Sequence, residues 1–339
     1  MTISTHQYLR TMSLKVSSAT QSIDFSNFWT TFSVRRGDFQ TPNNADIRIY
    51  NVKPETANLI SKNEFTTVSL KVGYQGGALG TIFTGTIVQF RQGRRDQLDS
   101  YVDITAADGD EAYHYSTISQ TIPAGTRPGS VADAIIKRLA AVGNQPISPG
   151  YAPNFPPTQS IRGQVLFGMC RNEMRRFALQ NDCKWSFQDG AVTLIPWTSF
   201  IPGGETPVIS VQSGLIGVPE QTQQGINIKT LMNPNYKVGT LVQLNSQINQ
   251  FRFALDFNSQ TPNSSIALQN KLAPNTGPNS SDQQGLYYVM VANHTGDTRG
   301  EAWYTDMVCL AADATLTNKD QSNALEVTGP FPIARYGGT

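Results

Sequence analysis

Histidine and cysteine, the side chains that most often transfer protons or bind metals, are rare in this sequence. The chain has three of each: His6, His114 and His294, and Cys170, Cys183 and Cys309. No histidine has an Asp, a Cys or another His at a spacing suited to binding a metal, so a structural role is expected for all three. The cysteines are too scattered for a metal knuckle, and their odd number favours buried, reduced thiols.

Three carboxylates lie close together in Asp108-Gly109-Asp110-Glu111. Oxygen ligands of this kind bind hard cations such as Ca²⁺. The segment lacks the ligand periodicity of a known calcium loop, so we interpret it as a solvated turn after a strand. The sequence alone leaves cation binding at this turn open.

Two further short motifs resemble known sites only by their letters. Gly76-Gly77-Ala78-Leu79-Gly80 resembles a phosphate-binding loop, but such loops open a helix. A strand is expected to follow here, which indicates a hairpin turn. Arg36-Gly37-Asp38 matches a cell-adhesion tripeptide, and we interpret this match as coincidence.

Arginines gather in two groups that are able to contact a phosphate or a carboxylate of a partner. They are Arg91 with Arg94 and Arg95, and Arg171 with Arg175 and Arg176. The second group lies mostly away from the apolar face of an expected helix, so a solvated face is the default interpretation. No Ser, Cys or Thr stands in a recognisable nucleophile elbow. The sequence therefore predicts no catalytic, cofactor-binding or metal-binding residue.

The overall charge balance argues against an electrostatic partner. Among 339 residues, 26 Lys and Arg face 25 Asp and Glu, and charged residues make up 15%, below the roughly 25% of an ordinary soluble domain. Binding of polyanionic nucleic acid needs a clustered excess of Lys and Arg. A polar surface with few charges is instead expected of a chain packed into an assembly. With no apolar run of 18 residues and no recognisable signal peptide, neither membrane insertion nor secretion is expected.

Two stretches of β-prone runs separated by turn residues are typical of a sandwich or barrel. In residues 46–50 and 68–72, apolar residues fall on every second position, which places them on one face of a strand. A short helix is expected over residues 54–60, with Leu59 and Ile60 pointing inward. The strands expected are 14–16, 28–34, 46–51, 67–74, 81–91 and 100–107 in the first stretch, and 208–211, 226–230, 240–244, 286–293 and 301–309 in the second.

Between the two β stretches the pattern changes to that of helices. One helix is expected from a cap at Ser130 to Gly143, and another over residues 164–180. A proline-rich crossing separates them. A hairpin follows over residues 183–196, with the favoured turn Gln188-Asp189-Gly190. Together these elements predict a small α+β unit.

Two segments in the last third of the chain are expected to contact partner proteins. Residues 258–284 are rich in Asn, Ser, Pro and Gln and are too long for a simple connection. Residues 329–339 contain two prolines and, near their end, two glycines, as in tails that are disordered or rest on a partner.

Several segments, taken in chain order, resemble the tail or baseplate hub proteins of tailed bacteriophages. Those that resemble the first barrel of the hub are residues 42–52 with 54–60, then Val68-Ser69-Leu70-Lys71-Val72-Gly73-Tyr74, 82–87 and 104–110. Those that resemble the opening of its second barrel are Gly214-Leu215-Ile216-Gly217-Val218-Pro219, 231–234 and 238–239. Residues 287–300 with 303–305 are similar to the closing strands of that barrel.

The resemblance implies a mainly β (α+β) fold with two tail-tube-like β-barrels and a small α+β domain between them. The implied domains are residues 1–116 for the first barrel, 117–204 for the α+β domain, 205–328 for the second barrel and 329–339 for a C-terminal tail that contacts a partner. Three chains would then close a ring of six similar barrels.

The function that the resemblance implies is structural. A homotrimeric ring would join the sixfold tail tube, or a distal tail protein, to the threefold central spike or tip protein, and would touch other baseplate proteins. It would line the channel for the tape-measure protein and then DNA, which is expected there only in passage. The family has no catalytic residues or cofactors to transfer. The expected place of the protein is the virion, with assembly in the cytoplasm of the host bacterium.

Two alternatives of other classes stay open at this point. A cell-wall-degrading enzyme would use two carboxylates, whose separation in space a sequence does not give. A glycan- or receptor-binding module would use exposed aromatic rings such as those of Trp185, Trp197 and Trp303.

Overall fold

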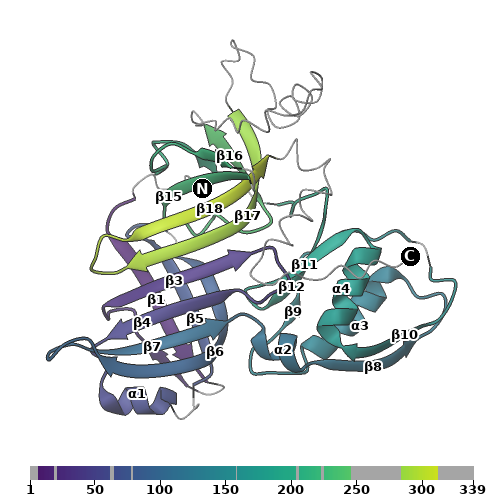
Figure 1. Ribbon diagram of the computed structural model, residues 1–339, viewed down its shortest axis with the longest axis horizontal. Coiled ribbons are helices and arrows are strands. Elements are labelled where there is room, and N and C mark those ends of the chain that lie inside the picture. The colour runs from purple at the N-terminus through teal and green to yellow at the C-terminus, as the bar shows by residue number, and fades with distance from the viewer. Residues whose placement is uncertain are drawn as a thin grey trace, which may run out of the picture.

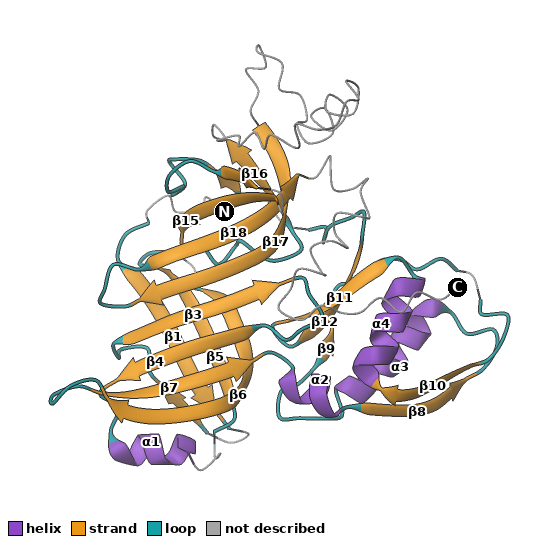
Figure 2. Ribbon diagram, viewed as in Figure 1, coloured by secondary structure: helices purple, strands orange, loops and turns teal. Residues whose placement is uncertain are grey.

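The computed structural model describes residues 7–18, 21–61, 65–77, 79–157, 159–203, 206–222, 225–245 and 284–311. Strands predominate, as predicted, and most of them gather in one broad sheet (Figures 1 and 2). The strands are β1 (Arg10–Ser17), β2 (Ser22–Asp24), β3 (Thr30–Gly37), β4 (Asn44–Tyr50), β5 (Thr67–Tyr74), β6 (Gly80–Arg94), β7 (Ser100–Ala107), β8 (Thr117–Ile122), β9 (Ser148–Pro149), β10 (Gln164–Met169), β11 (Cys183–Gln188), β12 (Ala191–Pro196), β13 (Val208–Ile209), β14 (Glu220–Thr222), β15 (Gly225–Leu231), β16 (Leu241–Asn245), β17 (Gln284–Asp297) and β18 (Trp303–Ala311). The helices are α1 (Pro54–Ser61), α2 (Asp110–Tyr115), α3 (Pro128–Leu139) and α4 (Cys170–Gln180).

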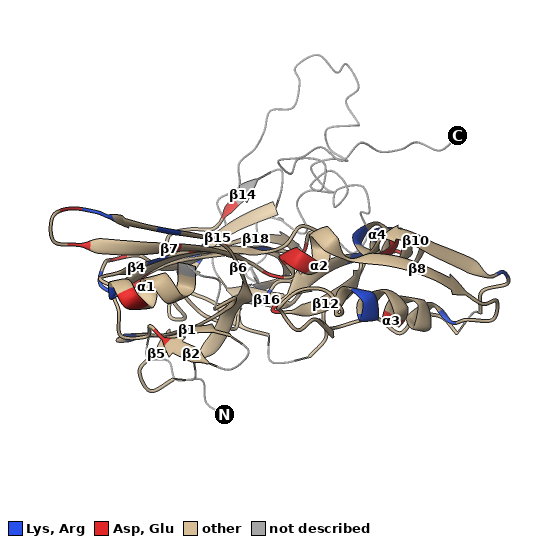
Figure 3. Cartoon of the chain, turned by 90° about the horizontal axis from the view of Figure 1, so that it is seen from below, with Lys and Arg blue, Asp and Glu red and all other residues tan. Residues whose placement is uncertain are grey.

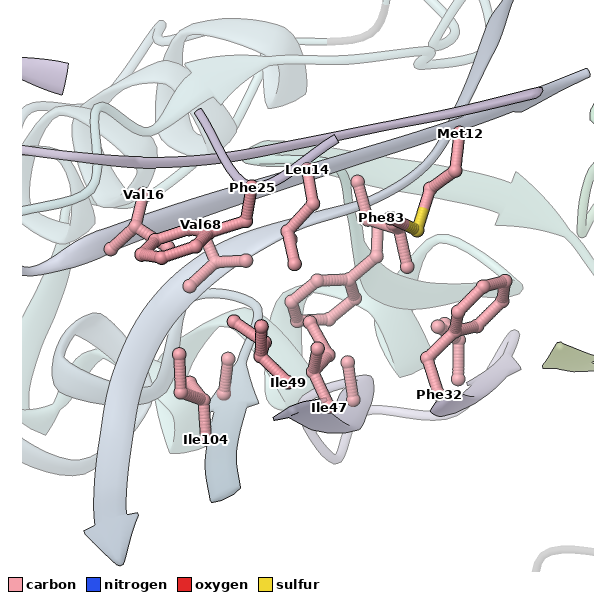
Figure 4. Packing of buried hydrophobic residues seen from close by; sticks show 14 of the residues in the cluster. Met12, Leu14, Val16, Phe25, Phe32, Ile47, Ile49, Val68, Phe83 and Ile104 are labelled. Atoms are coloured by element: carbon pink, nitrogen blue, oxygen red, sulfur yellow. The ribbon is translucent and has the colours of Figure 1, made fainter. Parts of the chain in front are cut away.

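The first β unit, which comprises β1 to β7 and α1, has two layers that share strand β6. A bulge between Ile87 and Gln89 divides this 15-residue strand, so that its first half pairs with β5 and its second half with β7. One layer runs β2-β1-β5-β6 and the other β6-β7-β4-β3. Alternate residues of both layers point inward, and Leu14, Ile47 and Phe83 meet in the resulting core (Figure 4).

Helix α1 contributes two residues to this core. Ala57 and Ile60 are buried, whereas Leu59 is 38% exposed. The expectation that Leu59 also points inward is therefore wrong. Residues three apart share a face of a helix, and a residue one position away from Ile60 lies about 100° around the axis.

The second β unit, which comprises β13 to β18, repeats this plan around its own core. Strand β17 has 14 residues and a bulge between Val289 and Val291. Its first half pairs with β16 on one edge, and β18 pairs along the other edge. From β18 the sheet continues to β15 and β14.

The two β units share one sheet. The second half of β17 pairs with β3, from Val291 opposite Gly37 to Asp297 opposite Thr31. The 13-stranded sheet therefore runs β14-β15-β18-β17-β3-β4-β7-β6-β5-β1-β2, with β16 beside the first half of β17 and β13 beside β16. Within the described ranges, neither unit is closed into a barrel by strand pairing, and the two-barrel arrangement remains a prediction.

The strand plan of the two β units corresponds element by element. β3, β4, β5, β6 and β7 pair among themselves as β14, β15, β16, β17 and β18 do, always antiparallel. In both units a long strand with a bulge, β6 or β17, is followed by an antiparallel partner, which has eight residues in β7 and nine in β18. The chain thus contains a structural repeat that its sequence does not display.

The α+β unit, which comprises α2 to β12, has a third hydrophobic cluster. Helix α3 begins at Pro128, with Arg127 as the N-cap and no side-chain cap. The predicted cap Ser130 lies inside the helix, because proline at the first helical position sets the start instead. Ile135 and Leu139 are buried. The domain limits at residues 116 and 204 remain predictions.

The predicted helix over residues 164–180 is wrong in its first third. Residues 164–169 form strand β10, which pairs with β8, and α4 begins at Cys170. Burial alternates there as in a strand: Leu166 is buried, whereas Val165 and Phe167 are exposed. Gly168 has a φ of 121°, which no α-helix accommodates.

The predicted hairpin is present as β11 and β12. Its turn residues Asp189 and Gly190 have φ values of 55° and 80°. Positive φ at both central positions is the requirement of a tight turn that matches strand twist, and Asp-Gly suits it. This turn contacts the first β unit, since Asp189 pairs with Arg36 of β3.

Candidate functional site: the junction of the units and the polar face of the sheet

Arg36, at the end of β3, is the centre of a buried contact between the first β unit and the α+β unit. Its side chain is 6% exposed. The guanidinium donates to the backbone oxygen of Ile82 at 2.8 Å, to Gln188 Oε1 at 3.0 Å and to Asp189 Oδ2 at 2.9 Å. Ile82 lies in the first half of β6, so one arginine joins two strands of the sheet to the tip of the β11–β12 hairpin.

Asp38 extends the contact to the second β unit. Its carboxylate is paired with Lys184 of β11 and accepts a hydrogen bond from the Tyr288 hydroxyl of β17 at 2.7 Å. Burial raises the pKa of Tyr288 well above its ordinary value, and the Asp38 carboxylate adds to the rise. The Tyr288 hydroxyl therefore keeps its proton and donates the hydrogen bond. One buried carboxylate therefore binds side chains from two other units.

Amide side chains complete the contact without adding charge. Asn43 Oδ1 accepts from the Gly37 amide at 3.0 Å, and Asn43 Nδ2 donates to the Phe187 carbonyl at 2.7 Å. Gln188 Nε2 donates to the Gly37 carbonyl at 2.8 Å. Backbone groups that β3 and β11 leave unpaired at their ends are satisfied in this way.

Asp108, at the end of β7, is a second buried carboxylate of the same region. Its Oδ1 accepts hydrogen bonds from Gln145 Nε2 at 2.7 Å and from the Gly190 amide at 2.9 Å. Burial raises the pKa of Asp108 to about 6, and the nearby Asp189 carboxylate adds to the rise. The two hydrogen bonds and Arg36 oppose it. This carboxyl therefore changes charge in a mildly acidic range.

We call this set of contacts the junction. Its members are Arg36, Asp38, Asn43, Asp108, Gln145, Lys184, Gln188, Asp189 and Tyr288. It joins the three units through side chains and contains no arrangement of a nucleophile, a base and an open cleft. Its chemistry is that of a structural connection.

The junction bears on two interpretations made from the sequence and corrects the second. The charged side chains of Arg36-Gly37-Asp38 are buried and partnered, which agrees with a coincidental match to the cell-adhesion tripeptide. Asp108 is 1% exposed, so this part of the acidic segment is not a solvated turn. Its partners Gln145 and Gly190 are distant in sequence, and no local pattern signals them. The other two carboxylates of that segment lie in α2, where Asp110 is near His114 and Glu111 binds Asn144.

The outward face of β17, β3, β4, β7 and β6 forms a polar surface with an open hollow of about 570 Å³. The charged side chains that line it are Asp46, Arg48, Arg91, Asp103 and Asp297. Arg48 binds both carboxylate oxygens of Asp103, at 2.6 and 2.9 Å, which raises the pKa of the arginine. Three carboxylates and two arginines line the hollow, so the face is polar without one dominant sign.

The basic groups noted in the sequence have several local partners. The Arg95 guanidinium lies over the stacked rings of Trp29 and Tyr50. Arg171 donates to the Tyr113 carbonyl, and Arg176 pairs with Glu173 on the same helix. None of these contacts assembles a phosphate site within the described residues.

His294 and the three cysteines are buried inside the protein. His294 is buried in β17, its Nδ1 is 3.0 Å from the Thr305 hydroxyl, and burial lowers its pKa to about 3. The three cysteines are buried and free, as expected. His6 and the predicted partner segments 258–284 and 329–339 lie outside the described residues, except that Gln284 begins β17.

The remaining motifs are structural. The glycine-rich segment 76–80 connects β5 to β6, as the hairpin interpretation predicts. In the described part of the chain, no group of three or more His, Cys, Asp and Glu is placed to hold a metal. None of the described helices has the length and apolar character needed to span a bilayer. Trp185, Trp197 and Trp303 are 1%, 8% and 1% exposed, so these rings are not available to a glycan.

Comparisons with known proteins agree with this architecture. The family described as baseplate hub gp41 matches residues 198–252, a segment that includes the predicted opening of the second barrel. No curated protein matches the sequence. Among solved structures, the 43 kDa tail protein of prophage MuSo2 from Shewanella oneidensis is similar, with a TM-score of 0.54 and 8% identity over 90% of this chain and 98% of that chain.

Two further structures share the fold. The tail protein from Neisseria meningitidis MC58 has a TM-score of 0.54 at 9% identity, over 91% of this chain and 99% of that chain. A chain of the Francisella PdpA–VgrG complex has a TM-score of 0.51 at 8% identity, over 91% of this chain and 54% of that chain. The resemblance to the tail and baseplate hub proteins of tailed phages is therefore confirmed: the chain has a phage tail-protein fold, and part of it matches the baseplate hub family.

Proposed function

We propose that three copies of this chain close the hub ring of a phage tail tip, which joins the sixfold tail tube to a threefold spike. The protein acts as a structural adaptor without catalysis, and each of its two β units serves as one of six similar barrel-like segments. The polar face of the sheet lines a channel for the tape-measure protein and then DNA. The family match and the tail-protein fold support this proposal.

The observation that carries the proposal is the pairing of β17 with β3 inside one chain. In the structural repeat, β17 corresponds to β6 and β3 corresponds to β14. Within the described residues, the outer edge of the second half of β6 has no strand partner, and neither has the outer edge of β14. The contact that joins the two units of one chain therefore has a counterpart available between chains: β6 of one copy with β14 of the next.

The repeat also gives the register of this contact. When the bulges are aligned, Thr295 of β17 corresponds to Gly93 of β6. Tracing the pairs across each unit makes Ser33 of β3 correspond to Glu220 of β14. Thr295 faces Ser33 within the chain. Gly93 of one copy is then expected to face Glu220 of the next, and Gln92 to face Gln221.

The charges at the two ends suit this register. Arg91 stands two positions before Gly93 on the same face of β6 and so reaches Glu220 diagonally, and Arg95 directly follows the strand at the same end. Pairing also removes the exposed backbone groups of two edge strands, which otherwise favour uncontrolled association. In a ring with closed symmetry, every copy pairs with a neighbour at both of its edges. Each copy contributes the eight strands from β14 to β6, and three copies complete the ring.

The polar face supports the role as a channel wall. It carries both signs of charge, and Arg48 is neutralised by Asp103. A wall with one dominant positive sign would hold DNA through its phosphates. The near-neutral face is compatible with passage. The burial of Trp185, Trp197 and Trp303 gives the glycan-binding alternative no support.

The proposal is tested by the mass of the protein assembly in solution and by the position of the protein in the tail. Sedimentation of the purified protein should give a species of three times 37.1 kDa, and images of labelled tails should place it at the tip as a ring. A stable monomer at high concentration, or a label outside the tail tip, would contradict the proposal.

A further inference from the structure

The ribbon formed by β8 and β10 in the α+β unit presents an exposed apolar face. Its inner face packs into the core of the unit through Ile118, Ile122 and Leu166. Its outer face carries Phe167, which is 75% exposed, and Val165, which is 61% exposed. An exposed phenylalanine and valine at alternate positions of one strand are unusual on a monomer, and such patches mark interaction sites.

Two separate segments, residues 123–127 after β8 and residues 159–163 before β10, meet at one end of the ribbon. Backbone hydrogen bonds from Gly125 to Ser160 at 2.7 Å and from Ser160 to Thr126 at 3.0 Å hold them together. Ile161, at the same end, is 94% exposed. Facing Val165 and Phe167 across the ribbon are Thr121 and Ser119, small hydroxyl side chains that leave the apolar residues prominent.

The surroundings of this face are basic. The α+β unit, residues 110–196, contains 8 Lys and Arg and 6 Asp and Glu, a net charge of +2. From residue 117 to 169 the only acidic residue is Asp133. Arg127 and Arg162 are exposed at the end of the ribbon. In Figure 3, blue patches lie on α3, on α4 and at the outer end of the β8–β10 ribbon, whereas α2, at the other end of the unit, is red.

We infer that the outer face of the β8–β10 ribbon binds an acidic segment of a different polypeptide, in which apolar side chains alternate with or lie beside Asp and Glu. Phe167, Val165 and Ile161 supply the apolar contact, and Arg127 and Arg162 pair with the carboxylates. The inference rests on the proposed function only in taking that polypeptide to be another protein of the tail.

The position of the ribbon separates this partner from a second copy of the chain. The copies are proposed to meet through β6 and β14 in the large sheet, whereas the ribbon extends away from that sheet in both views of the molecule (Figures 1 and 3). A single-stranded nucleic acid is a poorer fit, because stacking platforms use several aromatic rings. Here one ring is flanked by two aliphatic side chains.

A photo-reactive benzoyl-phenylalanine at position 167 of the full chain tests the inference. The cells that naturally produce the protein are irradiated, and cross-linked peptides are identified by mass spectrometry. The matched control carries the same group at position 211, since Val211 is 74% exposed and lies in the second β unit. We expect position 167 to cross-link at least fivefold more than position 211, to a peptide of another protein with Asp or Glu beside the linked residue.

A charge-reversed chain with Arg127→Glu and Arg162→Glu should lose at least fivefold of that cross-link while keeping its melting temperature. Cross-links only to another copy, only to nucleic acid, or at the yield of position 211 would overturn the inference, as would an undiminished yield in the charge-reversed chain. The same sample also shows whether the chain sediments with tails. Sedimentation tests the proposed function and the cross-link tests this inference, so the two failures are distinguished.

Discussion

At the scale of single residues, buried polar groups of the junction depend on partners that are remote in sequence. Arg36 meets Gln188 and Asp189 across about 150 positions, and Asp108 meets Gln145 across 37. A buried charge is stable only while these partners are present. The two β units are joined by the pairing of β17 with β3, whereas the orientation of the α+β unit against them is expected to depend on a small number of side chains.

Replacing Arg36 by methionine should destabilise the protein markedly. The change leaves the Ile82 carbonyl and the Gln188 amide oxygen without this donor and removes the ion pair to Asp189, which together should cost about 3 kcal/mol. The measurement is the first transition in urea unfolding. Arg35→Met is the matched control, because Arg35 is exposed and should change stability by less than about 0.5 kcal/mol. Equal midpoints for the two variants would contradict the assigned role of Arg36.

Asp108 should make stability depend on pH in a defined direction. Because its pKa is raised from 3.8 to about 6 in the folded protein, the folded state holds the proton more tightly than the unfolded chain. Its contribution is then fully favourable below pH 3.8 and is lost as the pH rises through 6, by roughly 3 kcal/mol in total.

Asp108→Asn isolates this effect, since an amide oxygen accepts the same two hydrogen bonds and does not titrate. The stability of the variant relative to the natural protein should rise between pH 4 and pH 7, as measured by urea unfolding at each pH. Parallel stability curves for the two proteins would show that the carboxyl does not titrate as described.

At the scale of elements, the tight turn of the β11–β12 hairpin positions Asp189 for the junction. Gly190→Ala should cost about 1–2 kcal/mol, because its φ is 80° and a Cβ there would lie 3.1 Å from Gln145 Nε2 and from the Pro146 carbonyl. Gly129→Ala in α3 is the matched control. A Cβ there meets nothing nearer than 3.8 Å, so alanine should be neutral or stabilising. Thermal unfolding compares them, and a loss of stability in both variants alike would refute the turn argument.

Elements set by local patterns could be predicted from the sequence, whereas those set by distant contacts could not. The hairpin turn is specified by Asp189-Gly190 itself, and β5 and β7 have the predicted limits. The segment 164–169 has apolar residues that fit either a helix or a strand, and only pairing with β8, more than 40 residues earlier, decides for the strand. The pairing of β17 with β3 joins residues more than 250 positions apart, so no sequence window contains it.

The candidate sites follow the same division. The scarcity of His and Cys at ligand spacing and the hairpin nature of residues 76–80 are local properties, which the sequence displays. The burial of Arg36, Asp38 and Asp108 is a property of the assembled units, so their roles appear only in the structure.

At the scale of the whole molecule, the two β units repeat one strand plan. In the proposed ring, the pairing of β17 with β3 inside one chain is the pattern for the pairing between copies. In the proposed ring, the exposed Glu220 of β14 lies diagonally opposite Arg91 of the neighbouring β6.

Glu220→Arg should therefore weaken trimer formation about tenfold, since a diagonal attraction becomes a repulsion worth about 1.4 kcal/mol. Combining it with Arg91→Glu should restore much of the loss, while Arg91→Glu alone should also weaken the trimer. Sedimentation equilibrium gives the trimer affinity of the natural protein, of the two single variants and of the double variant. Unchanged trimer affinity in Glu220→Arg would contradict the proposed register.

The central claim is that β6 of one copy pairs with β14 of the next, and a cysteine pair tests it most directly. Facing residues of antiparallel strands have Cα atoms about 4.5–5.5 Å apart, within the range of a disulfide. A chain with Gln92→Cys and Gln221→Cys should give covalent dimers and trimers on a non-reducing gel after mild oxidation, whereas either substitution alone should not give trimers. A double variant that stays monomeric on the gel, although both thiols react with a maleimide, would contradict the ring.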